Sequence, residues 1–393
     1  MLQLRFIIYN CLFFLPCISM GQTLLRDTLT IGDQDRTYVS YVPQSYTPAE
    51  KCPVVMVLHG GGNANGEDLI DRMHFDEVAD TAHFICLYPN GIANQWADGR
   101  GATTPDVLGV DDVAFLTALI DSFANVINLD YENIFVTGAS NGGMMTQRLA
   151  CETRGLFSAF ASMIASMPKP LLRTCNPESE VPMLIMNGTE DRLVPYNGGT
   201  LPPFTSGGAV LSTDQTIEYW RQVNQCSDTF QAVEVADKDI TDGSTVHLTT
   251  WIDCTESSSV RLYRVEGGGH TVPGQFTASN PSLVVGYTNQ DIDAAIEIWN
   301  FFKAHMQGLT ISADLIQAPN ISVYPNPTSS SITIAGDFLA PVAEVLILDT
   351  CGKSLIKSNS YRNIDISMLK AGIYVVQIKV GSQFYYKKIV IAQ

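Results

Sequence analysis

The sequence predicts an α/β layered domain followed by a small all-β domain, on the basis of three observations. From Tyr38 to about Phe302, strand-like and helix-like segments alternate along the chain. Several of the strand-like segments are apolar throughout, as expected of parallel strands that are covered on both faces. After Met306 the helical pattern stops and only short strand-like segments follow. The first region is therefore predicted to contain a mostly parallel sheet between layers of helices.

Six strands and two helices of the first region can be placed from the pattern. Val54–Leu58 and Ile134–Val136 consist only of apolar residues, and the segments at 113–121 and 292–303 have helical periodicity. The predicted strands are Tyr38–Val42, Val54–Leu58, Phe84–Tyr88, Ile134–Thr137, Met183–Met186 and Val260–Val265.

The first 21 residues have the pattern of a secretory signal peptide. They include a charged residue near the start, Arg5, continue with a short apolar stretch and end on the small residues Ser19 and Gly21. The apolar stretch is too short to span a bilayer, so cleavage near Gly21 is predicted, without a transmembrane segment. The signal peptide is thus predicted at residues 1–21. It is followed by a first domain at 22–306, a linker at 307–320 and a second domain at 321–393.

The charge balance of the chain disfavours some partners. There are 23 Lys and Arg residues against 40 Asp and Glu residues, which gives a formal net charge of -17. This charge repels phosphate backbones and anionic lipid surfaces, so nucleic-acid binding is not expected.

The most informative motif is Gly138-Ala139-Ser140-Asn141-Gly142. It lies between an apolar strand and the helical segment 144–150, and G-x-S-x-G in that position is typical of a nucleophile elbow. The glycines avoid collisions with the adjoining strand and helix, because a serine on so sharp a turn has a strained backbone. Chance also produces this motif in a chain with 30 glycines, so a base and an acid are needed to support it.

Three histidines follow Ser140 and are candidates for the base, since the chain order Ser, then Asp or Glu, then His is expected. His247 lies in an alternating strand pattern, and His305 closes an amphipathic helix. His270 lies in a glycine-rich loop immediately after a predicted strand. A loop in that place can bring a histidine over the serine, so His270 is predicted to be the base.

The acid is expected in the loop after the strand Met183–Met186, at the same edge of the sheet as the serine. Asp191 and Glu190 are the two candidates, and the residues alone leave both open. The structural alternative for Asp191 is a helix cap or a loop ion pair with Arg192.

Two backbone amides are predicted to bind the oxyanion, those of Asn141 and Gly61. Gly61 lies in the segment His59-Gly60-Gly61-Gly62, whose glycines let main-chain amides approach a substrate oxygen closely. The segment lacks the Gly-Lys-Ser/Thr of a phosphate-binding loop.

Neither a metal site nor a cofactor is predicted. No cysteine pair has C-x-x-C spacing. The most suggestive cluster of possible ligands lacks the H-E-x-x-H spacing of a zinc site and is expected to be a solvated helix face; it comprises His74, Glu77, Asp80 and His83.

The cysteines of the exported chain allow disulfides. Spacing suggests two local bridges, Cys151 with Cys175 and Cys226 with Cys254, although sequence alone does not fix connectivity. Cys86 is expected to be a buried thiol because it lies in an apolar strand. The states of Cys52 and Cys351 are left open.

Residues 38–302 resemble the polyhydroxybutyrate depolymerase-like esterases, secreted α/β-hydrolases that include feruloyl and acetylxylan esterases. The resemblance rests on the serine motif, extended by Gly143, and on these further segments: Leu58–Gly62, Tyr88–Gly91, Trp96 with Asp98–Gly101, Val110–Val113, Gly188–Asp191 with Val194–Tyr196, and Gly267–Thr271. It implies an α/β-hydrolase fold with Ser140 as nucleophile, His270 as base and Asp191 as orienting acid. It also supports the two disulfides.

The candidate substrate-binding residues are Trp96, His59 and Val272. Trp96 could stack on an aromatic acyl group or a sugar, or it could pack the loop that supports the site. Val272 stands where members of the family commonly have tryptophan, so the substrate pocket is expected to have a different shape.

Residues 321–393 are predicted to form a small antiparallel β-sandwich and resemble the C-terminal sorting domain of the type IX secretion system of Bacteroidetes. The matching segments, in the expected order, are Val323–Thr328, Leu369–Tyr374 and Lys387–Ile391. The resemblance implies that the secretion machinery is a partner and that the protein is extracellular or at the outer-membrane surface. A carbohydrate-binding sandwich is the alternative, but the segment lacks an obvious aromatic platform.

Taken together, the motifs predict a secreted serine ester hydrolase that acts on feruloyl or acetyl esters of plant-wall polysaccharides. Within the same chemistry, the alternative is a depolymerase of polyhydroxybutyrate or another polyester. A serine peptidase and a non-catalytic surface protein are the alternatives from other classes.

Overall fold

A computed structural model describes residues 23–62, 64–275, 284–307, 322–336, 342–348, 354–380 and 383–392 of the chain. The chain forms two compact units, Met1–Gly308 and Leu309–Gln393, which are described separately. The predicted signal peptide and all of the predicted linker except Gln307 lie outside the described residues. No helix within the described ranges is long and apolar enough to cross a membrane.

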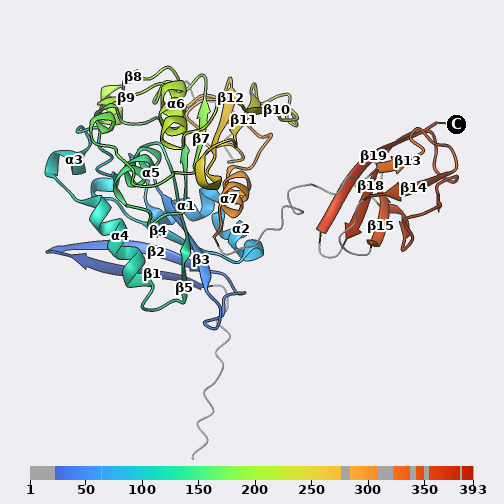
Figure 1. Cartoon of the computed structure of the whole chain (residues 1–393), viewed down its shortest axis with the longest axis horizontal. Coiled ribbons are helices and arrows are strands. Elements are labelled where there is room, and N and C mark those ends of the chain that lie inside the picture. Colours follow the sequence, from blue (N-terminus) through green and yellow to red (C-terminus); the bar gives the residue numbers. More distant parts are fainter. Residues whose placement is uncertain are drawn as a thin grey trace, which may run out of the picture. The chain divides into compact units, whose positions relative to one another are not determined.

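The first unit is built on one ten-stranded sheet (Figure 1). In spatial order its strands are β1 (Thr23–Ile31), β2 (Gln34–Val42), β4 (Ile85–Pro89), β3 (Cys52–Leu58), β5 (Leu129–Ala139), β6 (Ala159–Met163), β7 (Met183–Gly188), β12 (Val260–Glu266), β11 (Thr245–Trp251) and β10 (Gln231–Glu234). The six consecutive strands β4, β3, β5, β6, β7 and β12 are all parallel to one another. At one edge of the sheet β1 and β2, and at the other edge β11 and β10, pair with their neighbours in antiparallel fashion. The predicted mostly parallel sheet is therefore confirmed.

The six strands predicted in this unit are all present, with small shifts in their ends. The predicted strand Phe84–Tyr88, for example, is β4 one residue further along. The prediction missed three strands of this sheet, β1, β10 and β6. The sequence of β6, Ala-Phe-Ala-Ser-Met, contains none of the β-branched residues that favour strands. Its burial between β5 and β7 determines its conformation instead of local propensity.

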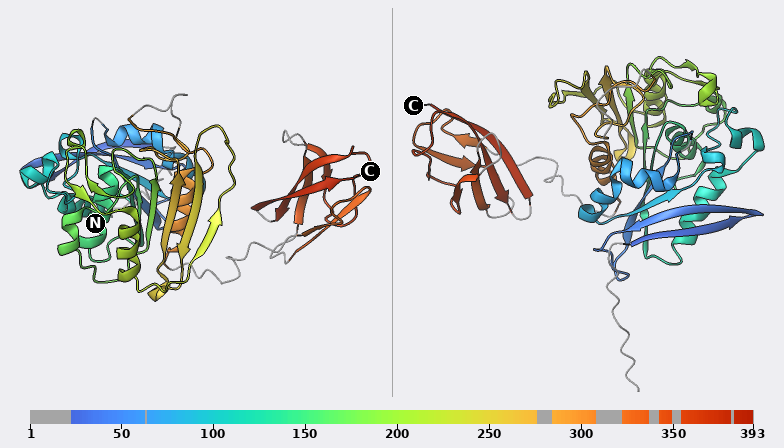
Figure 2. Two further views of the ribbon diagram at one scale, coloured as in Figure 1. Left: turned by 90° about the horizontal axis from the view of Figure 1, so that it is seen from above. Right: turned by 180° about the vertical axis from the view of Figure 1, so that it is seen from behind.

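Helices cover both faces of the sheet (Figure 2). Apolar residues of α4 (Asp112–Phe123), α5 (Asn141–Glu152) and α6 (Thr213–Val223) belong to one core. Residues of α1 (Gly66–Met73), α2 (Phe75–Ala82) and α7 (Ala294–Ala304) belong to a second core on the opposite face. The short helix α3 (Thr104–Leu108) and the two-stranded hairpin of β8 (Gly199–Thr200) and β9 (Ala209–Val210) lie in connecting segments.

The two cores explain why the central strands are apolar throughout. In β3, Val54, Met56 and Leu58 contribute to the first core, whereas Val55 and Val57 contribute to the second. Successive side chains of a strand point to opposite faces, so a sheet buried on both faces needs apolar residues at every position.

Two disulfides are present in the first unit, and they join the cysteines that the spacing paired. Cys151, in the last turn of α5, is bonded to Cys175, and Cys226, just after α6, is bonded to Cys254. Cys52 and Cys86 are buried free thiols. Cys351 lies outside the described residues.

The second unit consists of two antiparallel sheets. One is formed by β13 (Ser322–Tyr324), β14 (Ser331–Ala335) and β17 (Ile364–Asp365), and the other by β16 (Ser354–Ser358), β15 (Val342–Leu348), β18 (Gly372–Val380) and β19 (Gln383–Ile391). Isoleucines and valines of both sheets form one core, which includes Ile332 and Val376. The all-β prediction for this region is therefore confirmed.

Candidate active site

Ser140 lies at the tight turn between β5 and α5. Its backbone φ angle is 56°, a value that residues other than glycine rarely adopt. Two backbone hydrogen bonds hold the turn: the amide of Ser140 donates to the carbonyl of Met163 on β6, and the amide of Met144 donates to the carbonyl of Ser140, both at 2.9 Å. This backbone strain at the end of a central strand is typical of functional sites.

The glycines of the serine motif are needed for close backbone packing. A Cβ atom on Gly142 would lie 2.4 Å from the carbonyl oxygen of Leu58 at the end of β3. A Cβ atom on Gly138 would lie 2.5 Å from the carbonyl oxygen of Gly142. The turn can therefore approach β3 only because these positions carry no side chain, as the sequence analysis expected.

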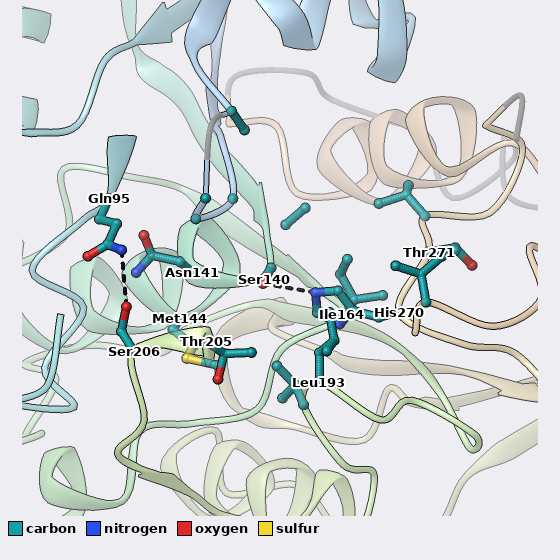
Figure 3. Close-up of a pocket in the computed structure, with 18 of the residues that line it drawn as sticks. Gln95, Ser140, Asn141, Met144, Ile164, Leu193, Thr205, Ser206, His270 and Thr271 are labelled. Atoms are coloured by element: carbon teal, nitrogen blue, oxygen red, sulfur yellow. Dashed lines mark hydrogen bonds between the residues drawn. The ribbon is translucent and has the colours of Figure 1, made fainter. Parts of the chain in front are cut away.

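The structure brings Ser140, His270 and Asp191 into one hydrogen-bonded chain. Figure 3 shows the part of this chain that joins Ser140 to His270. The Oγ atom of Ser140 lies 3.0 Å from Nε2 of His270, and Nδ1 of His270 lies 2.7 Å from Oδ2 of Asp191. The carboxylate can only accept, so Nδ1 carries the proton and Nε2 is free to accept the serine proton.

The carboxylate that contacts His270 in this hydrogen-bonded chain is that of Asp191 and not that of Glu190. The second carboxylate oxygen of Asp191 accepts the amides of Leu193 and Val194, both at 2.8 Å, and its side chain is buried. Glu190 is exposed. The residues alone had left these two open, because adjacent positions on an irregular loop give no periodic signal for the direction of a side chain.

A backbone segment near residue 285 supports the loop that carries His270. The amide of His270 donates to the carbonyl of Val285 at 2.6 Å, and the amide of Gly269 donates to the carbonyl of Tyr287 at 2.9 Å. A Cβ atom on Gly269 would collide with the Val285 carbonyl, so this approach requires glycine. The glycine-rich sequence before His270 therefore positions the imidazole.

The expected oxyanion donors lie next to each other. Asn141 is the first residue of α5, so its amide has no acceptor within the helix. An idealised Cβ atom on Gly61 would lie 3.7 Å from the Cβ of Asn141, and one on Gly60 would lie 3.5 Å from the Cβ of Ser140. The loop after β3 therefore runs directly beside the serine turn.

Two of the expected substrate-binding residues are buried, so that assignment is corrected. Neither Trp96 nor His59 is exposed, and neither lines the cavity at Ser140. The indole Nε1 of Trp96 donates to the carbonyl of His59 at 2.9 Å, and its backbone amide donates to Oδ1 of Asn141 at 2.7 Å. Trp96 thus packs the loop that supports Asn141, which was the structural alternative for this residue.

His59 also has a structural position. Its Nε2 accepts the amide of Gly91 at 2.9 Å, and its Nδ1 lies 2.7 Å from the carbonyl of Gly60, to which it donates. Only a neutral imidazole can accept a hydrogen bond at Nε2 while it donates one from Nδ1. Burial lowers the pKa of His59 to about 4, so the ring is neutral at pH 7.

Buried histidines should make the protein less stable in mild acid. Burial lowers the pKa of His59 and of His305 to about 4, against 6.5 for an ordinary histidine. Between pH 6.5 and pH 4 these two histidines bind protons in the unfolded chain but not in the folded chain. The free energy of unfolding should therefore decrease as the pH is lowered through this window. We expect this fall to be less steep in His305→Gln, measured by urea unfolding at several pH values.

The quantity that tests this expectation is the difference in pH dependence between the wild-type protein and His305→Gln. Burial raises the pKa of Asp98 and of Asp112, and these groups act in the opposite direction as the pH falls. Their contribution is common to both proteins and cancels in the difference. Identical pH dependence in wild type and His305→Gln would contradict the effect expected of His305.

Ser140 opens into a cavity of about 520 Å³. Figure 3 shows Gln95 and Ser206 on one side of Ser140, and His270 with Thr271 on the other. Of the expected substrate-binding residues, Val272 lines this cavity. The other apolar side chains of the lining are Ala64, Leu69, Met73, Ala139, Met144, Ile164, Leu193, Val194, Phe204, Val284 and Val285.

Most residues of this lining were missed by sequence reasoning. Phe204 is 76% exposed at the cavity, and Ser206 accepts a hydrogen bond from Nε2 of Gln95 at 3.0 Å. The segment that carries them is flanked by two glycine pairs, Gly198-Gly199 and Gly207-Gly208, all with positive φ. These pairs were a signal of an irregular functional loop. Within the described ranges, no group of three or more His, Cys, Asp or Glu residues is arranged to hold a metal ion.

Comparisons with known proteins match both parts of the chain. Residues 322–392 match the family described as the secretion system C-terminal sorting domain. The first unit is similar to several esterases. A putative esterase, NocK, of Nocardia uniformis subsp. tsuyamanensis is 26% identical over 289 residues, which cover 71% of this chain and 82% of that protein. Feruloyl esterase C of Emericella nidulans is 30% identical over 200 residues, 48% of this chain and 69% of that protein.

A third relative is modular. The bifunctional acetylxylan esterase/xylanase XynS20E of Neocallimastix patriciarum is 23% identical over 232 residues. The similarity covers 59% of this chain and 30% of that longer protein.

Proposed function

The chain belongs to the esterase family that includes feruloyl esterase C and is a carboxylic ester hydrolase; on this premise we propose that it is an exported serine esterase of plant-wall polysaccharides. Its catalytic residues are Ser140 as nucleophile, His270 as base and Asp191 as the group that orients His270. The observation that carries the proposal is the hydrogen-bonded chain from Ser140 Oγ through His270 to Asp191 at the edge of the cavity.

The proposed reaction begins when His270 Nε2 takes the proton of Ser140 Oγ as this oxygen attacks the ester carbonyl. The carbonyl oxygen becomes an oxyanion, which accepts hydrogen bonds from the amides of Asn141 and Gly61. His270 then gives its proton to the leaving alcohol. A water molecule, deprotonated by the same imidazole, cleaves the acyl-enzyme and regenerates the serine.

The amide of Asn141 is well fixed for this role. Its side chain holds the neighbouring loop on both sides: Oδ1 accepts the amide of Trp96, and Nδ2 donates to Oδ2 of Asp98 at 2.6 Å. A donor that is already in place when charge develops stabilises the transition state without a cost of reorganisation.

The size and lining of the cavity favour a feruloyl over an acetyl group as the acyl part of the substrate. A volume of about 520 Å³ far exceeds what an acetyl group occupies, and most of the side chains that line it are apolar. Phe204 offers an exposed ring against which a flat aromatic acyl group can stack.

A substrate panel tests the proposal. We expect the purified protein to hydrolyse methyl ferulate with a higher kcat/KM than methyl acetate, and to release ferulate from feruloylated xylan oligosaccharides. Hydroxybutyryl oligoesters and a peptide amide complete the panel. Preferred hydrolysis of the hydroxybutyryl ester or of the amide would overturn the proposed substrate class.

Phe204 provides a variant that tests the acyl group separately. Phe204→Ala should lower kcat/KM for methyl ferulate about tenfold, since an aromatic contact of this kind contributes about 1 kcal/mol beyond its buried area. Hydrolysis of p-nitrophenyl acetate, which has no large acyl group, serves as the matched control and should change less than twofold. Equal losses on both esters would contradict a role of Phe204 in acyl recognition.

The C-terminal unit supports export as part of the proposal. The match at 322–392 indicates passage through the type IX secretion system, and the predicted signal peptide at 1–21 would direct the chain to the preceding step. The proposed location is extracellular or at the outer-membrane surface, where plant-wall polysaccharides are accessible.

A further inference from the structure

The charges that line the cavity differ in sign from those of the chain as a whole. The described lining residues include two arginines, Arg72 and Arg100, and no aspartate or glutamate. The chain has 40 acidic against 23 basic residues. A cleft lined by charges of one sign attracts ligands of the opposite sign.

Arg100 is already engaged within the protein. Its Nε atom lies 2.8 and 3.0 Å from the two carboxylate oxygens of Asp98, and both side chains are almost completely buried. Its Nη1 atom donates to the carbonyls of Thr205 and Gly207, next to Phe204. The charge of Arg100 is therefore balanced by Asp98, and the side chain holds the cavity wall in place.

Arg72 differs from Arg100 in its surroundings. It is exposed in the last turn of α1, and it lines the cavity together with Leu69 and Met73 from the same face of that helix. It takes part in no ion pair with another described residue. Asp293 shares a neighbouring recess with Arg72, but the Asp293 carboxylate accepts the amide of Ile296. Arg72 thus brings to the cavity a positive charge that no ion pair with a described residue balances.

The helix after the serine adds to this positive potential. Ser140 precedes the first residue of the 12-residue helix α5, and the amino end of a helix carries a partial positive charge. Arg72 and the amino end of α5 at Ser140 therefore both contribute a positive potential to the cavity.

We infer that Arg72 is a specificity-determining residue that binds a carboxylate carried by the ester substrate. The inference rests on the proposed esterase function and specifies its substrate further. A guanidinium binds a carboxylate through two parallel charge-assisted hydrogen bonds, which fix the substrate in orientation as well as in place. In a plant-wall polysaccharide the carboxylate belongs either to the acyl group or to a uronic acid next to the esterified sugar.

Paired substrates distinguish these two sources. On the acyl side, p-nitrophenyl hemisuccinate is compared with p-nitrophenyl butyrate, which has the same number of acyl carbons without the charge. On the alcohol side, acetylated xylan oligosaccharides with a glucuronic acid branch are compared with unbranched ones. We expect the wild-type protein to have the higher kcat/KM for the charged member of at least one pair, and this preference should fall as salt is added.

Arg72→Gln should lower kcat/KM for the preferred charged ester about tenfold and change that for its neutral partner less than twofold. Arg72→Lys keeps the charge but not the two parallel hydrogen bonds, so it should retain only part of the preference. Arg173→Gln, at an exposed arginine that does not line the cavity, is the matched control and should leave both members of the pair unchanged. A cation in the last turn of a helix also stabilises the helix, so the readout is selectivity rather than stability.

Each other outcome counts against the inference in a recognisable way. Active protein without a preference for either charged ester would overturn the role of Arg72 and leave the esterase proposal standing. The same holds if Arg72→Gln lowers the charged and the neutral ester equally. Inactivity on all four esters would overturn this inference, and inactivity on methyl ferulate as well would overturn the esterase proposal with it.

Discussion

Ser140→Ala should lower kcat for p-nitrophenyl acetate by about 10⁴-fold or more. In the proposed mechanism the variant removes the oxygen that attacks the carbonyl. His270 only activates that oxygen and Asp191 only orients His270, so neither can replace it. The remaining rate would come from the amides of Asn141 and Gly61 and from substrate binding. Initial rates at saturating substrate, with wild type and variant at equal concentration, measure the effect.

Two controls separate chemistry from folding in this experiment. The substitution removes one oxygen atom from a side chain at the cavity surface, so the melting temperature should change little. Ser45→Ala removes the same atom from an exposed loop serine and should leave kcat unchanged. A Ser140→Ala protein that retains more than a few per cent of wild-type kcat would refute the proposed nucleophile.

Buried charges near the serine explain how the loop that contacts Asn141, a proposed oxyanion donor, is held. The carboxylate of Asp112 lies 2.6 Å from Nη2 of Arg36 and accepts the amide of Ala97 at 2.7 Å. Asp98, which follows Ala97 in the sequence, forms an ion pair with Arg100, and its carboxylate accepts a hydrogen bond from Nδ2 of Asn141. Desolvation raises the pKa of Asp98 and of Asp112, and the neighbouring arginines oppose this by favouring the charged carboxylates. The loop after Gln95 is thereby fixed against the first turn of α5.

The proximity of the three proposed triad residues could be predicted from the sequence because each of them has a local signal. A glycine-flanked serine follows an apolar strand, and the acid and the histidine follow two other strands of the same parallel sheet. The carboxyl ends of parallel strands meet at one edge, so the order of elements places Ser140, Asp191 and His270 together before any contact is known.

The lining of the cavity could not be predicted in this way. An aromatic side chain such as that of Trp96 is of a type that stacks on substrates, and the local sequence does not indicate that Trp96 is buried. The structure shows that the side chain of Asn141 hydrogen-bonds to the backbone of Trp96. Phe204 and Arg72 lie in a loop and on a helix far from the serine motif. Their position at the cavity results from tertiary packing, which hydrophobic periodicity does not report.

Gly142→Ala should prevent the serine turn from forming as it does in this fold. The added Cβ atom would lie 2.4 Å from the carbonyl oxygen of Leu58 and 2.5 Å from that of His59. Both are backbone atoms at the end of β3, so they can move only if the central strand or α5 moves. We expect the free energy of unfolding to fall by about 3 kcal/mol or more, with esterase activity lost because the oxyanion amides are displaced.

Gly61→Ala is the matched control for the effect of Gly142→Ala on stability. Its Cβ atom would meet only the Cβ of Asn141, at an ordinary contact distance of 3.7 Å, and its φ angle is not in the left-handed region. Urea unfolding should therefore show a change of less than about 1 kcal/mol for this variant. Similar losses of stability in both variants would mean that any added side chain in these loops is harmful. A large loss in Gly142→Ala alone would show that the serine reaches its position because residue 142 leaves room for β3.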